Sequence, residues 1–99
     1  MMDPDLPDFT IADVVISTAG RDAGSLFYVL ETDGIWLSLV NGVDRRIEKP
    51  KRKKCKHVKK VLRSETRVAE KLRSGDKVLN SELRRDLAYL SKAMPLEGI

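Results

Sequence analysis

The sequence predicts a mainly β protein with some α structure, namely a small β-barrel of about five short strands followed by two short helices. Short β-branched and aromatic runs, two of them followed by Asp-Gly or Asn-Gly, fill residues 11–63, and apolar residues at helical spacing follow in residues 64–99. With 99 residues the chain has the length of one domain. We expect a flexible acidic lead-in over residues 1–10, the barrel over 11–63 and a helical C-terminal extension over 64–99.

The expected strands are short runs rich in Val, Ile, Leu and aromatic residues. We place them at residues 13–18, 26–32, 35–40, 43–48 and 57–62, of which the fourth is the weakest and the fifth closes the barrel. Phe27 and Tyr28 of the second strand are expected in the core. A single sheet of this size has two unpaired edges unless it curls, so the strand pattern predicts a closed barrel.

Two dipeptides at the ends of strands indicate tight turns. Asp33-Gly34 and Asn41-Gly42 each lie between two strand-like runs. Asp-Gly and Asn-Gly are pairs that accept positive φ at both central positions of a type I′ hairpin. We therefore expect the second, third and fourth strands to form an antiparallel meander joined by two such hairpins.

Two helices are expected after the strands. Val68 and Leu72 lie on one face of the first, which ends at Gly75, and Asn80 or Ser81 is expected to cap the second. The second has an apolar stripe and is expected to end before a proline; these residues are Leu83, Leu87, Leu90 and Pro95. One stripe per helix predicts helices that pack on the barrel or on each other. The alternative is a docking element for a protein partner, or a second RNA contact through Arg84, Arg85 and Lys92.

The net charge of +4 conceals an uneven distribution of charge along the chain. Residues 1–44 carry a net charge of −7, residues 45–63 carry +10 with Glu48 as the sole acid, and residues 64–99 carry +1. A cationic block of this density repels itself unless anions occupy it, and counter-ion release favours binding to nucleic acid. The pattern predicts a polyanionic partner; a solvated loop, or a run that merely resembles a nuclear-localisation signal, is the alternative.

The candidate RNA-binding residues are the cations of this block, which would contact phosphates rather than read bases. They are Arg45, Arg46, Lys49, Lys51, Arg52, Lys53, Lys54, Lys56, Lys59 and Lys60. Arg21 joins them from the loop bounded by Gly20 and Gly24, where each glycine accepts positive φ or lets an RNA backbone approach closely.

The third strand adds one aromatic candidate. Ile35, Leu37 and Leu39 share one face of this strand, and Trp36 and Ser38 share the other. Trp36 is a candidate for stacking on a base. The alternative is that it packs in the core or at the rim of the barrel, as a lone tryptophan in a small barrel more often does.

Residues 14–24, followed by the apolar run 26–30, resemble the KOW motif of ribosomal proteins and of some transcription factors. Residues 41–54, which contain Lys-Pro-Lys, are similar to a segment of bacterial KOW-domain RNA-binding proteins. Those proteins are in turn similar to large-subunit ribosomal proteins of the archaeal and eukaryotic type. The resemblance covers roughly residues 12–60 and implies an SH3-like barrel and RNA binding, with Gly24 at the hallmark glycine of the motif.

The loop departs from the KOW pattern at one position. Many KOW loops carry a lysine just before the hallmark glycine, where this chain has Ala23. This loop is therefore poorer in positive charge, so we expect Arg21 and residues 45–60 to carry more of the binding.

The sequence argues against an enzyme, a bound metal and a cofactor. Cys55 and His57 are the single cysteine and the single histidine, whereas zinc takes four ligands, and no nucleophile–base pair or phosphate-cradling loop is recognisable. The acidic start over residues 1–8 differs from a signal peptide, and no apolar run is long enough to span a membrane. Together with the unpaired cysteine, these features predict a cytoplasmic protein in a reducing compartment.

We therefore expect a basic, non-enzymatic RNA-binding protein that acts in translation, as a ribosomal or ribosome-associated protein. Its expected partner is structured RNA, in particular ribosomal RNA, and its C-terminal helices could contact the ribosome or another protein. The alternatives are a protein–protein adaptor and a transcription-elongation-type KOW module, which would use the barrel or the helices. We expect no membrane partner.

Overall fold

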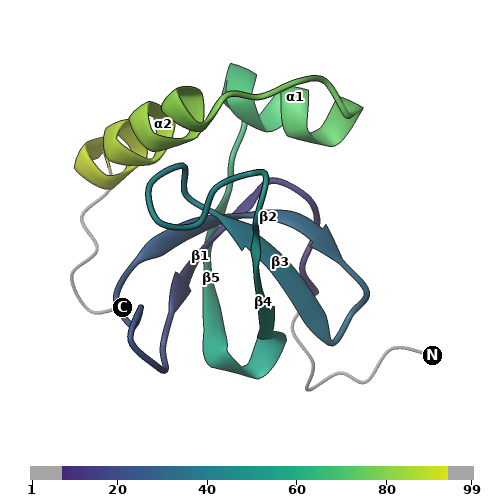
Figure 1. Ribbon diagram of the computed structural model, residues 1–99, viewed down its shortest axis with the longest axis vertical. Helices are drawn as coiled ribbons and strands as arrows, with labels where there is room; N and C mark the ends of the chain where they lie inside the picture. Colours follow the sequence, from purple (N-terminus) through teal and green to yellow (C-terminus); the bar gives the residue numbers. More distant parts are fainter. Residues whose placement is uncertain (1–7, 94–99) are drawn as a thin grey trace.

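The structure is a computed structural model that describes residues 8–93. Its elements are β1 (Asp13–Ser17), β2 (Leu26–Thr32), β3 (Trp36–Val40), β4 (Lys51–Lys54), the 3₁₀ helix η1 (Cys55–His57), β5 (Val58–Arg63), α1 (Arg67–Ser74) and α2 (Asn80–Ala93). The strands form one antiparallel sheet, and both helices lie together on one side of it (Figure 1). The molecule is thus a small mixed α/β protein.

The sheet has the strand order β4-β3-β2-β1-β5 and is open. β5 pairs with β1, β4 pairs with β3, and within residues 8–93 no ladder joins β4 to β5. The two edge strands are connected through η1 instead. The expected antiparallel pairing of the second strand with the third is confirmed, whereas closure into a barrel is not. A physical reason is the composition of β4, because an edge strand made of lysine and arginine resists pairing with a further strand.

One face of the sheet curves around its own core. The buried side chains on this face come from β1, β2, β3, η1, β5 and the segment before β1: Phe9, Val15, Phe27, Val29, Leu37, Leu39, Cys55 and Val58. Side chains of β3 and β5 meet in this cluster although two strands separate them in the sheet, so the sheet must curve. Irregular register between Val14 and Val15, and between Val29 and Glu31, allows the strands to bend.

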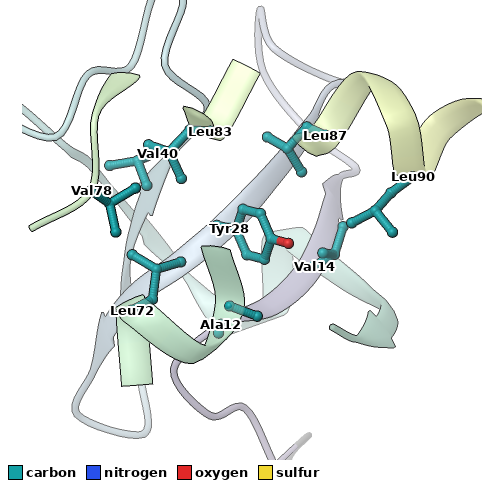
Figure 2. Close-up of a cluster of buried hydrophobic side chains, with 10 residues drawn as sticks. Ala12, Val14, Tyr28, Val40, Leu72, Val78, Leu83, Leu87 and Leu90 are labelled. Atoms are coloured by element: carbon teal, nitrogen blue, oxygen red, sulfur yellow. The ribbon is translucent and has the colours of Figure 1, made fainter. Parts of the chain in front are cut away.

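The opposite face packs against both helices. Val14, Tyr28 and Val40 alternate with residues of the curved core along their strands and share a second cluster with Leu72 of α1 and Leu83 of α2 (Figure 2). Burial of each such leucine contributes roughly 1.5–3 kcal/mol. The expectation that the helices pack on the sheet is confirmed. So is the stripe expected on the second helix, whose residues are all buried: Leu83, Leu87 and Leu90.

The helix boundaries agree with the sequence except at one cap. The side chain of Thr66 caps α1, and Gly75 ends it with φ +79° in the left-handed region. α2 begins at Asn80, but the prediction that Asn80 or Ser81 caps it is wrong. The backbone N–H of Leu79 instead donates to Glu82 Oε1 at 3.1 Å, which leaves the Asn80 side chain available for another contact.

The fourth strand was predicted in the wrong place. Residues 43–48 belong to an irregular loop, and β4 runs through the lysine-rich segment that follows it. β4 contains no apolar residue, so hydrophobic alternation could not indicate it. Its position results from backbone pairing with β3, in which Leu37 lies opposite Lys53 and Leu39 opposite Lys51.

The two predicted type I′ turns are also wrong. Gly34 and Gly42 have positive φ, but neither Asp33 nor Asn41 does, whereas a type I′ turn needs positive φ at both positions. The aspartate side chain organises the first turn, because Asp33 Oδ1 accepts hydrogen bonds from the backbone N–H groups of Ile35 (3.0 Å) and Trp36 (2.8 Å).

The loop between β3 and β4 is fastened to the start of α2. Asn80 Oδ1 accepts from the N–H of Ile47 at 2.9 Å, and the Asn80 amide donates to Glu48 Oε1 at 2.8 Å. Gly42 lies so close that a Cβ atom on it would be 2.2 Å from the carbonyl oxygen of Asn80. The helix thereby positions a loop that carries Arg45, Arg46 and Lys49.

Two sequence expectations fall on residues outside those described, namely most of the acidic lead-in (residues 1–7) and the helix end at Pro95. The described end of the lead-in includes Phe9, which is buried in the curved core. Neither helix within residues 8–93 has the length and apolar character required to cross a bilayer.

Candidate nucleic-acid interface

The cationic block of residues 45–63 is distributed over the β3–β4 loop, β4, η1 and β5. Its charges do not form one uniform surface, because acids from the first half of the chain pair with some of them. Arg52, Lys53, Lys60 and Arg63 each make an ion pair. The burial of the partner carboxylate separates cations with a structural role from cations available to a ligand, since Asp22 and Asp13 are buried and Asp33 is exposed.

Lys53 is buried and has a structural role. Its side chain is 10% exposed, and its Nζ lies 2.5 Å from Asp22 Oδ1, 2.8 Å from Ser17 Oγ and 2.7 Å from the carbonyl oxygen of Ala19. Burial alone would raise the pKa of Asp22, but the hydrogen bonds from Lys53 and Ser17 outweigh it and lower that pKa below the usual 3.8. Lys53 therefore ties the β1–β2 loop to β4 and does not lie on the surface where the sequence placed it.

Lys60 is also engaged by an acid. Its Nζ is 3.1 Å from Oδ2 of Asp13, whose side chain is 1% exposed, and it donates to the backbone carbonyl of Asp8. It also lies 5.7 Å from the centre of the Phe9 ring. An unpaired carboxylate as buried as that of Asp13 would be costly, so Lys60 balances a charge within the protein.

Lys60 is itself exposed, and the remaining candidate cations are exposed or half-buried. Arg21, Arg46, Lys49, Arg52, Lys54, Lys56 and Lys59 are exposed, and Arg45 and Lys51 are half-buried. The ion pair of Arg52 with Asp33 spans 3.9 Å between side chains that are both more than 60% exposed. Water and salt screen such a pair, so Arg52 can exchange it for a phosphate.

The clearest grouping of these cations surrounds Trp36. In the register of β3 and β4, Trp36 lies opposite Lys54, and Ser38 lies opposite Arg52. The guanidinium carbon of Arg52 is 5.1 Å and the Lys54 ammonium 5.4 Å from the centre of the tryptophan ring, within cation–π range. Trp36 itself is 37% exposed, so it lies at the rim and not in either core.

A shallow polar hollow lies next to this ring. Its walls are Glu31, Thr32, Asp33, Trp36, Ser38 and Arg52. Hydrogen bonds from the backbone N–H groups of Trp36 and Ile35 lower the pKa of Asp33, so this carboxylate is ionised at neutral pH. Ile35, predicted to share one face of the third strand with Leu37 and Leu39, precedes β3 and is 57% exposed in the turn.

The glycine-bounded loop between β1 and β2 has the conformation expected of it. Gly20 and Gly24 have φ +83° and +91°, and a Cβ on Gly24 would meet no atom of residues 8–93 within 4 Å. Arg21 is exposed in this loop, and the Lys53–Asp22 pair holds the loop against β4. The loop is thus positioned next to the cationic strand.

Cys55 is 5% exposed in the curved core. Among residues 8–93, no three or more His, Cys, Asp and Glu side chains lie close enough together to hold a metal ion.

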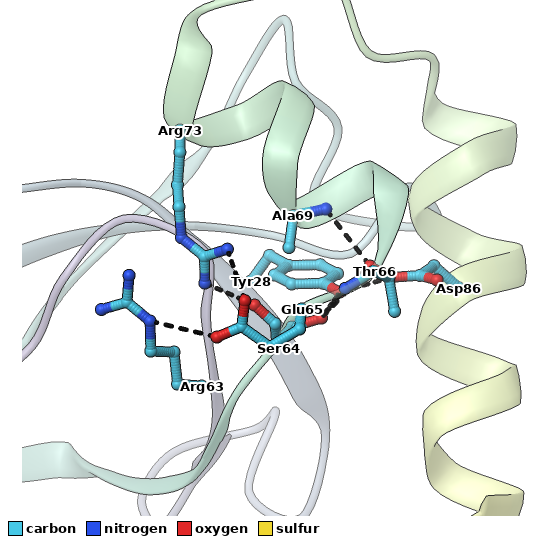
Figure 3. Close-up of polar contacts among 8 residues, drawn as sticks. All are labelled: Tyr28, Arg63, Ser64, Glu65, Thr66, Ala69, Arg73 and Asp86. Carbon is cyan, nitrogen blue, oxygen red and sulfur yellow. Dashed lines mark hydrogen bonds and ion pairs between the residues drawn. The ribbon is translucent and has the colours of Figure 1, made fainter.

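A polar network that the sequence did not indicate joins the sheet to both helices (Figure 3). The hydroxyl of Tyr28 donates to Asp86 of α2 and lies 2.8 Å from Ser64 Oγ, and Thr66 Oγ1 donates to the same Asp86 oxygen at 2.8 Å. Burial, and then the hydrogen bond to Asp86, raise the pKa of Tyr28 to about 12. In the sequence Tyr28 resembles any other core aromatic, so nothing there indicated this network.

No protein-family model matches the chain, and no curated protein matches it. The resemblance to KOW-domain proteins therefore stays a prediction from the sequence.

Proposed function

We propose that this protein binds RNA through the cations of the β3–β4 loop, β4, η1 and β5. The observation that carries the proposal is the exposed Trp36 ring with Arg52 and Lys54 beside it. Cations next to an accessible aromatic face provide both contacts that nucleic acid uses, since phosphates bind the charges and bases stack on the ring. Lys53 is buried with Asp22, and Lys60 is paired with the buried carboxylate of Asp13, so the proposed RNA contacts come from the remaining cations of the block.

A KOW-type, SH3-like unit is part of this proposal. It is supported by a curved five-stranded antiparallel sheet whose last strand pairs with the first, and by the positive φ of Gly24, at the position of the motif's hallmark glycine. The resemblance of residues 41–54 to ribosome-related KOW proteins favours ribosomal RNA as the ligand and a cytoplasmic role in translation. Co-sedimentation of the protein with ribosomal particles in a sucrose gradient tests this narrower assignment.

The salt dependence of binding tests the RNA-binding surface. An interface variant replaces with glutamine the exposed cations that make no ion pair within residues 8–93, namely Arg46, Lys49, Lys54, Lys56 and Lys59. A matched helix variant replaces five exposed cations of the C-terminal part, namely Arg67, Lys77, Arg84, Arg85 and Lys92. Each phosphate contact contributes about 0.7–0.9 to the slope of log K against log salt.

We expect the interface variant to lose up to about 4 units of that slope, and the helix variant to keep most of it, although both lose the same net charge. An interface variant with the parental slope and affinity for ribosomal RNA would remove this surface from the mechanism. A parent that does not bind RNA at low salt would contradict the proposed function as a whole.

A protein–protein adaptor is the second candidate, because one observation on the helices favours it. Tyr89 of α2 is 64% exposed and borders a shallow, mostly apolar hollow together with Val68 of α1. Pull-down after nuclease treatment distinguishes the candidates: a partner that persists without RNA and is lost with Tyr89→Ser favours the adaptor. If that partner is RNA polymerase, the transcription-elongation alternative gains support.

A further inference from the structure

We propose that Trp36 is a stacking site for an unpaired base, so that the preferred ligand is a single-stranded or looped nucleic-acid segment and not an uninterrupted duplex. The inference rests on the proposed RNA-binding function and specifies the ligand class at the same surface. It is carried by the position of the tryptophan along β3.

Trp36, Ser38 and Val40 lie on the same face of β3, because side chains alternate along a strand. Val40 is completely buried in the cluster that includes the helices, whereas Trp36 at the other end of the strand is 37% exposed. In Figure 1 both helices lie at one end of the sheet, and the η1 turn lies at the other end. The helices therefore cover one half of this face and leave the Trp36 half open.

The contacts of the ring are of a kind that a base can replace. Arg52 and Lys54 lie over it at 5.1 and 5.4 Å from its centre, and Lys54 is exposed. An exposed cation–π contact changes an equilibrium constant by about 2- to 5-fold, whereas a stacked base changes it by about 5- to 150-fold. Stacking of a base in place of one cation therefore stabilises the complex, and the displaced ammonium or guanidinium group can then pair with a phosphate.

The charges around the ring direct the phosphate backbone to one side. Glu31 and Asp33 border the hollow beside Trp36, and their carboxylates repel phosphate. Lys54, opposite Trp36 on the edge strand, attracts it. The backbone of a bound strand therefore runs along β4, and its base turns towards the ring. The base must be unpaired, since paired bases in an A-form helix are stacked and do not offer their faces to a side chain.

The chain contains a single tryptophan, so its fluorescence reports on this site alone. The probes are a single-stranded RNA hexamer, an abasic hexamer with the same number of phosphates, and a blunt RNA duplex. We expect the single strand to quench the emission, and the abasic strand and the duplex to leave it nearly unchanged. Trp36→Leu should weaken single-strand binding by about 5- to 150-fold and change abasic-strand binding by less than about 2-fold.

Two controls separate stacking from a general structural effect. Trp36→Phe keeps an aromatic face and should recover part of the lost single-strand affinity. Tyr89→Leu removes an exposed aromatic ring from α2 and should leave single-strand affinity unchanged. Thermal unfolding of each variant identifies any loss that is due to misfolding, and the parental protein with the abasic strand provides an independent readout.

The possible failures are distinguishable. Single strand, abasic strand and duplex bound equally well without quenching would overturn the stacking site and leave RNA binding intact. Unchanged single-strand affinity in Trp36→Leu would do the same. Quenching by polyglutamate but not by RNA would overturn it in favour of an acidic peptide. A protein that binds none of the three nucleic acids at low salt would overturn both the inference and the proposed function.

Discussion

The ammonium of Lys53 on β4 lies 2.5 Å from the carboxylate of Asp22 in the β1–β2 loop, and both side chains are only 10% exposed. The next residue, Lys54, is exposed beside Trp36. Adjacent lysines of one cationic run thus have different roles, because side chains of a strand point alternately to its two faces.

Lys53→Met should lower the free energy of unfolding by about 1–3 kcal/mol, because it leaves the Asp22 carboxylate without its main hydrogen-bond donor. Lys54→Met should leave stability within about 0.5 kcal/mol of the parent and reduce affinity for RNA. Urea denaturation and a filter-binding assay measure the two quantities. Equal effects of the two substitutions on both measurements would contradict the separation of roles.

The Lys53–Asp22 pair should also appear in the pH dependence of stability. The pKa of Asp22 in the folded protein lies below its usual 3.8, so the folded state favours the ionised form. This contribution is fully present above about pH 4–5 and is lost as the pH falls through 3.8 towards the folded-state pKa. Asp22→Asn should remove that part of the acid destabilisation, measured by thermal unfolding between pH 5 and pH 2. A variant whose stability falls with acid as steeply as the parent's would show that the carboxylate does not contribute.

The bond between Tyr28 and Asp86 holds α2 against the sheet. Tyr28→Phe should lower the free energy of unfolding by about 1–2 kcal/mol, because it removes one hydroxyl from a buried network and retains the ring. Tyr89→Phe removes the same hydroxyl from a side chain that is 64% exposed and should change stability by less than about 0.5 kcal/mol. Chemical denaturation of both variants, with unchanged m-values, makes the comparison. Similar losses in the two would disprove a special role for the Tyr28 hydroxyl.

Gly42 is expected to be the least replaceable of the turn glycines. A Cβ at this position would lie 2.2 Å from the Asn80 carbonyl oxygen, whereas a Cβ on Gly34 would meet no atom of the described residues within 4 Å. Both have positive φ, of +77° and +98°. Gly34→Ala should therefore cost about 1–2 kcal/mol through backbone strain alone, and Gly42→Ala about 2–5 kcal/mol through strain together with overpacking. Melting temperatures provide the comparison, and a Gly42→Ala protein as stable as Gly34→Ala would contradict the close contact between the loop and α2.

The local parts of the fold were predictable because their signals are local. The second strand was predicted at residues 26–32 and lies there, since its β-branched and aromatic residues favour extended backbone. The apolar stripe from Leu83 to Leu90 predicted both a helix and its buried face, without knowledge of the sheet on which that face packs. In contrast, β4 is a strand because its backbone pairs with the backbone of β3. A run of lysine and arginine has no apolar pattern that could predict this pairing.

In the candidate site, too, some features follow from local sequence and others from tertiary contacts. The sequence by itself determined the amount and place of positive charge along the chain, the apolar strands and the two amphipathic helices, because each of these depends on neighbours within a few residues. The tertiary structure alone decided which cations pair with an acid. Asp22 is 31 residues from Lys53 in the chain, and Asp13 lies on β1, which pairs with the strand β5 that carries Lys60. It also decided that the helices cover Val40 and leave Trp36 open. Ion pairs and exposure depend on distances in space, and residues far apart in the chain set those distances only once the sheet has curved and the helices have docked.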